Sequence, residues 1–218
     1  MASELFVDKI TGKTGTAGSA PLSMSGNTLT ATLGASSTVP ASIGGSMHFI
    51  SKATADGTTS SIEFTSLGNH SSFKDLVFVL NGLTPATDNV EFQSQVAISG
   101  TTYLTSNYYY VLTRAYSNGS SINNDSYASS TSICRIQYCG NDGHLSGKLT
   151  LYGHQNTTYR KSLMGDISAW IESDYINTNH CGGWYHNSSS DEITAIKFFY
   201  SSGYIASGSI AMYGIKDA

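Results

Sequence analysis

Residues 193–215 read ITAIKFFYSSGYIASGSIAMYGI, and this stretch decides the fold class. Two runs rich in β-branched and aromatic residues, Ile193–Tyr200 and Ser207–Ile215, are separated by the turn cluster Ser201–Gly203. Apolar and polar side chains alternate along the runs, which is the period of a strand that buries one face. The stretch therefore predicts two strands joined by a tight turn.

The same period of two continues back to about residue 46, and no window shows the spacing of an amphipathic helix. Turn clusters such as Asn81-Gly82 separate the runs. Short strands at this spacing predict an all-β fold: an antiparallel jelly-roll-like β-sandwich over residues 46–218, preceded by an extended N-terminal arm. The predicted strands are Met47–Thr54, Ser61–Ser66, Asp75–Leu80, Val90–Ser99, Tyr103–Tyr116, Ser132–Tyr138, Gly147–His154, Ser162–Glu172, Ile193–Tyr200 and Ser207–Ile215.

A shorter pattern occurs twice in the chain. Gly147–Gly153 and Gly208–Gly214 both read Gly, any residue, apolar, any residue, apolar, Tyr, Gly. Two equivalent strands far apart in the chain suit the paired Greek keys of a jelly roll.

Residues 1–45 differ in composition from the rest of the chain. Apart from Leu5, Phe6, Val7 and Ile10 they are mainly Gly, Ser, Thr and Ala, which is too little apolar surface to fold alone. We expect an extended arm whose four apolar residues dock onto another protein. A dispensable tail is the alternative.

The composition excludes several partners. Of the 218 residues, 39% are hydrophobic and 12% are charged, and the net charge is −4. Without a basic stripe the chain cannot neutralise phosphates, so no nucleic-acid partner is expected. No apolar run is long enough to span a bilayer, so membrane insertion is not expected either.

The three cysteines, Cys134, Cys139 and Cys181, are an odd number in a chain large enough to need no cross-links. They are therefore predicted to be reduced thiols. The spacing of the first two is looser than a zinc knuckle. Asn123–Asp125 and Asn141–Asp142 offer oxygen ligands for Ca²⁺, but Asx-rich turns explain both. We expect no metal and no cofactor.

Catalytic patterns are also weak. The sequence holds no G-x-S-x-G elbow for a nucleophilic serine. Three carboxylates, Asp166, Glu172 and Asp174, lie close in sequence, but on one strand Asp166 and Glu172 would be farther apart than a glycosidase pair. The sequence predicts that the protein is not an enzyme, and a polysaccharide hydrolase is the least favoured hypothesis.

Aromatic residues indicate a binding or contact surface more clearly than the carboxylates indicate catalysis. Fourteen tyrosines are present, and five rings form two runs that suit sugar stacking or subunit contacts. These candidate interface or glycan-stacking residues are Tyr108, Tyr109, Tyr110, Trp184 and Tyr185. Strand packing with alternate rings inward is the alternative for Tyr108 and Tyr110.

The carboxy-terminal run resembles the ending of a β-rich domain found in virion proteins of marine tailed bacteriophages. The match runs through Ser202–Gly208 and Met212–Lys216. Upstream, Ile62–Leu67 and Phe73–Leu83 are similar to the same family's early hairpin, and Ser3–Gly12 is similar to openings of phage tail-fibre and appendage proteins. The resemblance covers about Ser46 to Ala218, with gaps in the middle.

This resemblance implies a jelly-roll-like, non-enzymatic virion structural protein, made in the host bacterial cytoplasm and exposed on the particle surface. A tail fibre or appendage subunit is favoured; a capsid (head) decoration protein and a carbohydrate-binding module for host glycans are the alternatives. The expected partners are further copies of the chain, other virion proteins bound through the arm, and a host surface glycan.

A trimer is the expected assembly. Thr101–Tyr116 carries one Arg and no Lys, Asp, Glu or Pro, so as an edge strand it would invite pairing unless subunits covered it. The alternative is a central strand with both neighbours supplied by its own chain.

Overall fold

A computed structural model describes residues 22–25, 28–31, 46–119, 122–171, 175–185 and 191–216. The chain divides into two compact units, Met1–Gly44 and Gly45–Ala218. In the first unit, β1 (Leu22–Ser25) pairs antiparallel with β2 (Thr28–Ala31).

The docking residues expected in the arm, Leu5, Phe6, Val7 and Ile10, lie outside the described residues. The arm therefore stays a prediction.

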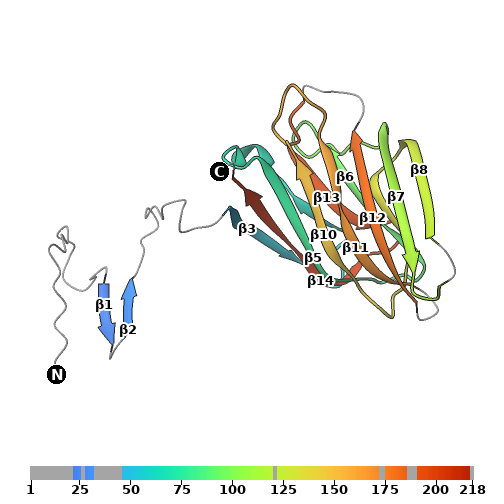
Figure 1. Ribbon diagram of the computed structural model, residues 1–218, viewed down its shortest axis with the longest axis horizontal. Helices are drawn as coiled ribbons and strands as arrows, with labels where there is room; N and C mark the ends of the chain where they lie inside the picture. The colour runs from blue at the N-terminus through green and yellow to red at the C-terminus, as the bar shows by residue number, and fades with distance from the viewer. Residues whose placement is uncertain are drawn as a thin grey trace. The chain divides into compact units, whose positions relative to one another are not determined.

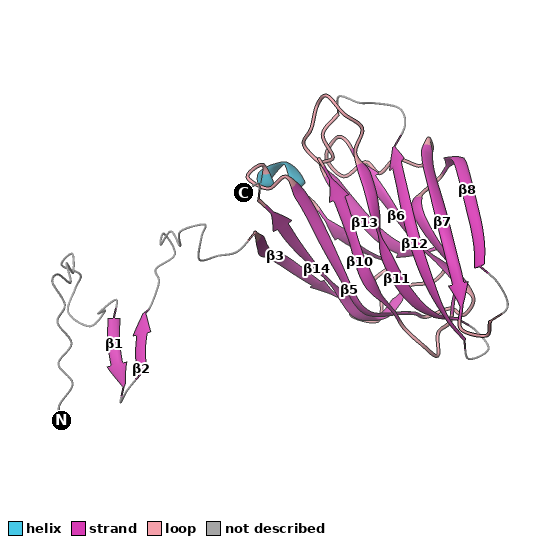
Figure 2. Cartoon of the chain, viewed as in Figure 1, coloured by secondary structure: helices cyan, strands magenta, loops and turns pink. Residues whose placement is uncertain are grey.

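The second unit is built almost wholly from strands (Figure 2). One short 3₁₀ helix, η1 (Leu67–His70), is the only helix among the described residues. The strands are β3 (Met47–Thr54), β4 (Ser61–Phe64), β5 (Asp75–Pro85), β6 (Val90–Ala97), β7 (Tyr108–Tyr116), β8 (Ile122–Ser130), β9 (Ile133–Cys139), β10 (Leu145–Tyr152), β11 (Ser162–Ile171), β12 (Tyr175–Tyr185), β13 (Ala195–Tyr200) and β14 (Ile205–Ile215).

These strands form two antiparallel layers (Figure 1). The large sheet has the order β3-β14-β5-β10-β11-β12-β7-β8, and the small sheet has the order β9-β6-β13-β4. A single pairing, Ile171 with Cys139, links β11 of the large sheet to β9 of the small one. The predicted all-β sandwich is confirmed.

The connections make this sandwich a jelly roll. The chain passes between the sheets in the succession β3, β4, β5, β6, then β9, β10, β13, β14. The four-stranded sheets β3-β14-β5-β10 and β9-β6-β13-β4 are the two halves of an eight-stranded jelly roll. Two inserted hairpins, β7–β8 and β11–β12, lengthen the large sheet beyond β10.

The two halves enclose an aromatic core. Phe64, Phe78, Phe92 and Phe198 are buried, and Phe198 lies 5.2 Å from Phe78 and 6.1 Å from Phe92 between ring centroids. Tyr200 packs against Phe92 at 5.7 Å. These rings come from both sheets, so the alternation seen in the sequence is the inward face of each strand.

The two copies of the repeated pattern lie along β10 and β14, which pair with β5 on opposite sides. Their registers against β5 differ by two residues: Leu149, the third residue of its copy, and Met212, the fifth of its copy, both lie opposite Phe78. The similarity therefore marks two strands that pair with the same central strand, but not at equivalent positions.

Several strand predictions need correction. Asn81-Gly82, predicted as a turn, lies inside β5, where the register against both neighbours shifts. Gly82 has a φ of 61°, and a Cβ on Gly208 would lie 2.4 Å from the Gly82 carbonyl oxygen. The two glycines thus allow a bulge that continues the strand. Strands β8 and β12 were not predicted.

The edge assigned to Thr101–Tyr116 is also wrong. Strand β7 begins at Tyr108 and pairs with β12 on one side and β8 on the other. Because its own chain supplies both neighbours, β7 is a central strand. The edges of the large sheet are β3 and β8.

Two of the cysteines are not reduced thiols. Cys134 in β9 and Cys181 in β12 form a disulfide between the two sheets. Cys134 has a φ of 57°, which breaks the simple alternation expected for this strand. Cys139 remains free and buried, and burial raises the pKa of its thiol to about 12.

Candidate functional site

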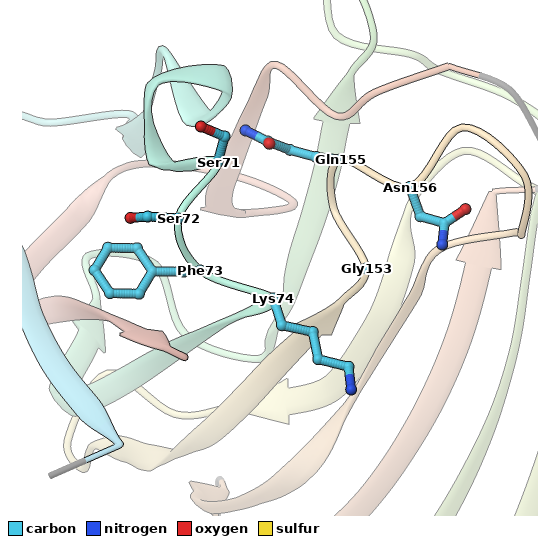
Figure 3. Close-up of a pocket in the computed structure, with 7 residues that line it drawn as sticks. All are labelled: Ser71, Ser72, Phe73, Lys74, Gly153, Gln155 and Asn156. Atoms are coloured by element: carbon cyan, nitrogen blue, oxygen red, sulfur yellow. The ribbon is translucent and has the colours of Figure 1, made fainter. Parts of the chain in front are cut away.

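A polar pocket of about 300 Å³ lies between the loop before β5 and the loop after β10 (Figure 3). Gln155 donates to the carbonyl of Gly68 at 2.7 Å, and Asn156 accepts from the amides of Thr158 and Tyr159 at 2.7 and 2.8 Å. Gln155 therefore links the loop after β10 to η1, and Asn156 fixes the turn within its own loop. The lining residues are Ser71, Ser72, Phe73, Lys74, Gly153, Gln155 and Asn156.

A different kind of hollow, of about 270 Å³, lies where β7, β8 and β12 run side by side. We call it the aromatic hollow. No ionisable side chain other than tyrosine lines it. Its lining residues are Tyr109, Tyr110, Val111, Ser126, Tyr127, Ala128 and Trp184.

The register of the strands builds this hollow. Tyr109 and Trp184 are directly opposite each other on β7 and β12, and their rings are 5.9 Å apart and nearly parallel, at 9°. Next to them, β8 carries the small exposed residues Ser126 and Ala128. Ser129 has a φ of 56°, and the pairing of β7 with β8 shifts there. A stacked aromatic pair beside small residues leaves the space open.

The five predicted aromatic residues separate into two groups. Tyr108 and Tyr110 are buried, as strand packing requires. The hydroxyl of Tyr108 accepts from the Val96 amide at 2.9 Å and donates to the Leu104 carbonyl at 3.1 Å. Neither ring offers a surface for another molecule.

Tyr109 and Trp184 lie on the opposite face of the large sheet. Tyr109 and Trp184 line the hollow with Val111, whose side chain is 56% exposed. The side chain of Tyr185 lies outside the described part of the structure. Val111, Ser126 and Ala128 were missed because small or aliphatic residues on a strand carry no chemical signal in the sequence.

Tyr110 and its partner Tyr127 lie beneath the hollow, on the inward side of β7 and β8. Their rings stack at 4.6 Å, and the Tyr127 hydroxyl accepts from Gln137 at 3.2 Å. Burial raises the pKa of Tyr110, so its phenol is neutral across the physiological range. Arg135 lies 5.8 Å from the Tyr127 ring and is paired with Glu91.

Of the three carboxylates weighed for catalysis, only Asp166 lies among the described residues. Asp166 contacts His180 at 2.6 Å on the exposed face of the large sheet, whereas Glu172 and Asp174 lie outside the described residues. Asn123–Asp125, predicted to form an Asx-rich turn, instead lie inside β8, where Asp125 pairs with Arg114 and Asn124 accepts from Thr113 at 2.9 Å.

Over the described ranges, no three His, Cys, Asp or Glu side chains gather as a metal ion would need. Likewise, none of the described helices has the length and apolar character needed to cross a bilayer.

No family model, curated protein or solved structure matches the chain. The fold therefore defines only a class, an antiparallel jelly-roll β-sandwich with two added hairpins. Any function has to follow from the residues of this chain.

Proposed function

We propose that the protein is a non-enzymatic structural subunit of a tailed-bacteriophage virion, a tail fibre or appendage subunit that assembles as a homotrimer. The resemblance of the carboxy-terminal run supports the phage assignment. In the structure this run forms β13 and β14, one strand in each sheet of the jelly roll.

The observation that carries the assembly role is the exposed apolar edge at β3. Met47 is 51% exposed and Phe49 is 61% exposed, and among the described strands β3 pairs with β14 alone. An edge strand that also carries large exposed apolar side chains is a natural contact for another chain.

A groove of about 440 Å³ extends this apolar edge into the opening between β3 and β4. Its lining includes Ile50, Phe64 and Met212, with Lys52 and Glu63 among the charged groups. Further copies of the chain would cover this edge in the assembled particle.

The assembly is tested by sedimentation of the purified full chain. Wild type should sediment as a compact trimer, and Phe49→Lys should dissociate it because a charge cannot be buried against a partner without cost. Tyr204→Lys, at another exposed aromatic residue, is the matched control. A monomeric wild type at micromolar concentration contradicts the proposal.

The virion role is tested on phage particles that lack the protein. Electron microscopy should show a missing appendage, and tens of copies or fewer per wild-type particle would place the subunit in the tail. Deleting residues 2–12 should leave the domain folded but abolish incorporation. Unchanged particles would rule the role out.

A further inference from the structure

We propose that the aromatic hollow binds a neutral sugar ring, with Tyr109 and Trp184 as its stacking residues. The inference goes beyond the structural role and does not depend on it, because the hollow belongs to one chain and lies at the opposite end of the large sheet from β3.

Stacking is the first argument. A sugar ring presents an apolar C–H face, and flat aromatic side chains that are half-buried and rigid suit such a face. Tyr109 and Trp184 hold each other in place across β7 and β12 at 5.9 Å. Val111 adds an exposed apolar surface on the same side of β7. The platform therefore exists before any ligand arrives, which lowers the cost of ordering on binding.

Charge is the second argument, and it selects a neutral ligand. The lining of the hollow holds no Asp, Glu, Lys, Arg or His. The nearby charged groups are paired, Arg135 with Glu91 and Arg114 with Asp125. An acidic sugar would bring its charge into the hollow without a cation to meet it, so uncharged pyranosides are favoured.

Polar groups are the third argument. The exposed Ser126 can bond a sugar hydroxyl as either donor or acceptor. The indole nitrogen of Trp184 is buried and has no hydrogen-bond partner among the described residues, so this edge of the ring carries a donor that the described protein groups do not satisfy.

The size of the hollow favours a sugar ring over a peptide as its ligand. Aromatic-lined surfaces also bind Pro-rich segments, but those ligands lie along extended grooves. The hollow encloses about 270 Å³, which is near the lower limit for small-ligand sites. One ring fits this space better than an extended chain.

The direct test is isothermal titration of the full wild-type chain with the methyl glycosides of glucose, galactose, mannose and N-acetylglucosamine. Glucuronic acid and an oligoproline peptide are the comparison ligands. We expect saturable binding of at least one neutral glycoside and weaker or no binding of glucuronic acid. Binding of none of the four, or of oligoproline alone, would overturn the proposal.

Variants then locate the site. Tyr109→Ala and Trp184→Ala should each weaken the binding about tenfold or more, as expected when one stacking ring is lost. Ser126→Leu fills the hollow from an exposed strand position, so it should abolish binding with an unchanged melting temperature. Tyr159→Ala, at a ring that is 70% exposed in the loop after β10, is the control and should bind like wild type. Equal affinity of wild type and Ser126→Leu would overturn the site. The titration uses the purified chain and no virion. A negative titration would therefore reject the sugar site alone, and the structural role would still be tested by sedimentation and by electron microscopy of particles.

Discussion

The jelly-roll strands and the added hairpins share one large sheet but have different interiors. Between the two jelly-roll halves the interior is aromatic, with Phe78 and Phe198 fully buried. On the inward face of the added strands β7 and β12 it is mixed, because Arg114, Asn177 and Asn179 are buried there beside Tyr110 and Leu112. We call these regions the jelly-roll part and the extension.

The two interiors are stabilised in different ways. Aromatic burial is favourable without a specific partner for each atom. Buried polar groups cost free energy unless each is hydrogen-bonded. In the extension, Asn179 donates to Asn177 at 2.8 Å, Arg114 donates to Gln137 at 2.6 Å, and the Cys134–Cys181 disulfide links the sheets. The comparison teaches that the extension combines packing with a few directional contacts between buried polar groups, whereas the jelly-roll part depends mainly on packing.

The largest effect is expected in the aromatic core. Phe198→Ala should lower the free energy of unfolding by about 3–5 kcal/mol, the range for deleting a buried ring, measured by chemical denaturation. Phe199→Ala, on the outward side of the same strand and only partly buried, should cost much less. Similar losses for the two variants would contradict the packing account.

The disulfide should have the next largest effect. Reducing it, or replacing Cys134 and Cys181 with Ala, should cost about 2–4 kcal/mol. The comparison predicts where this loss appears: amide hydrogen exchange should accelerate in β7, β8 and β12 before it accelerates in β5. Uniform acceleration across both sheets would show that the extension has no stability of its own. Reductant should have no further effect on the double variant.

The buried arginine should contribute less. Arg114→Met should cost about 1–2 kcal/mol, because it leaves Gln137 and the 27%-exposed Asp125 without their cation. A double-mutant cycle with Asp125→Asn measures the coupling. Additive losses would mean that the pair contributes nothing beyond its separate side chains.

The smallest expected effect is a pH dependence of the free energy of unfolding, and it arises from a histidine in the jelly-roll part. Burial lowers the pKa of His154, with His70 adding to the shift while Asp75 opposes it. The unfolded chain therefore takes up the proton first, and stability falls as the pH drops below the ordinary histidine pKa of about 6.5. The loss between pH 7 and pH 6 should be at most about 0.7 kcal/mol. His154→Gln should remove this dependence, whereas exposed His180→Gln should retain it.

Alternation, or a continuous apolar run, was enough to find the strands of the jelly-roll part in the sequence. Ile193–Tyr200 alternates because one face of the strand is buried in an apolar core, whereas Asp75–Leu80 is a continuous apolar run whose successive side chains Leu76, Val77 and Phe78 are all buried; both runs are strands in the structure. Strand β8 escaped prediction because Asn, Asp and Ser occupy most of its positions, and β12 because Asn177, Asn179, Gly182 and Gly183 interrupt its apolar pattern. A buried asparagine on β12 is indistinguishable in the sequence from an asparagine in a loop.

The sequence by itself determined the all-β class, the sandwich and the aromatic character of Tyr109 and Trp184, because these depend on local composition and period. Tertiary structure alone decided that Cys134 bonds Cys181 across 47 positions, that β7 has two neighbours, and that Tyr109 lies against Trp184. These are contacts between segments far apart in the chain. Their register is set by how whole strands pack, and no local pattern of residues carries that information.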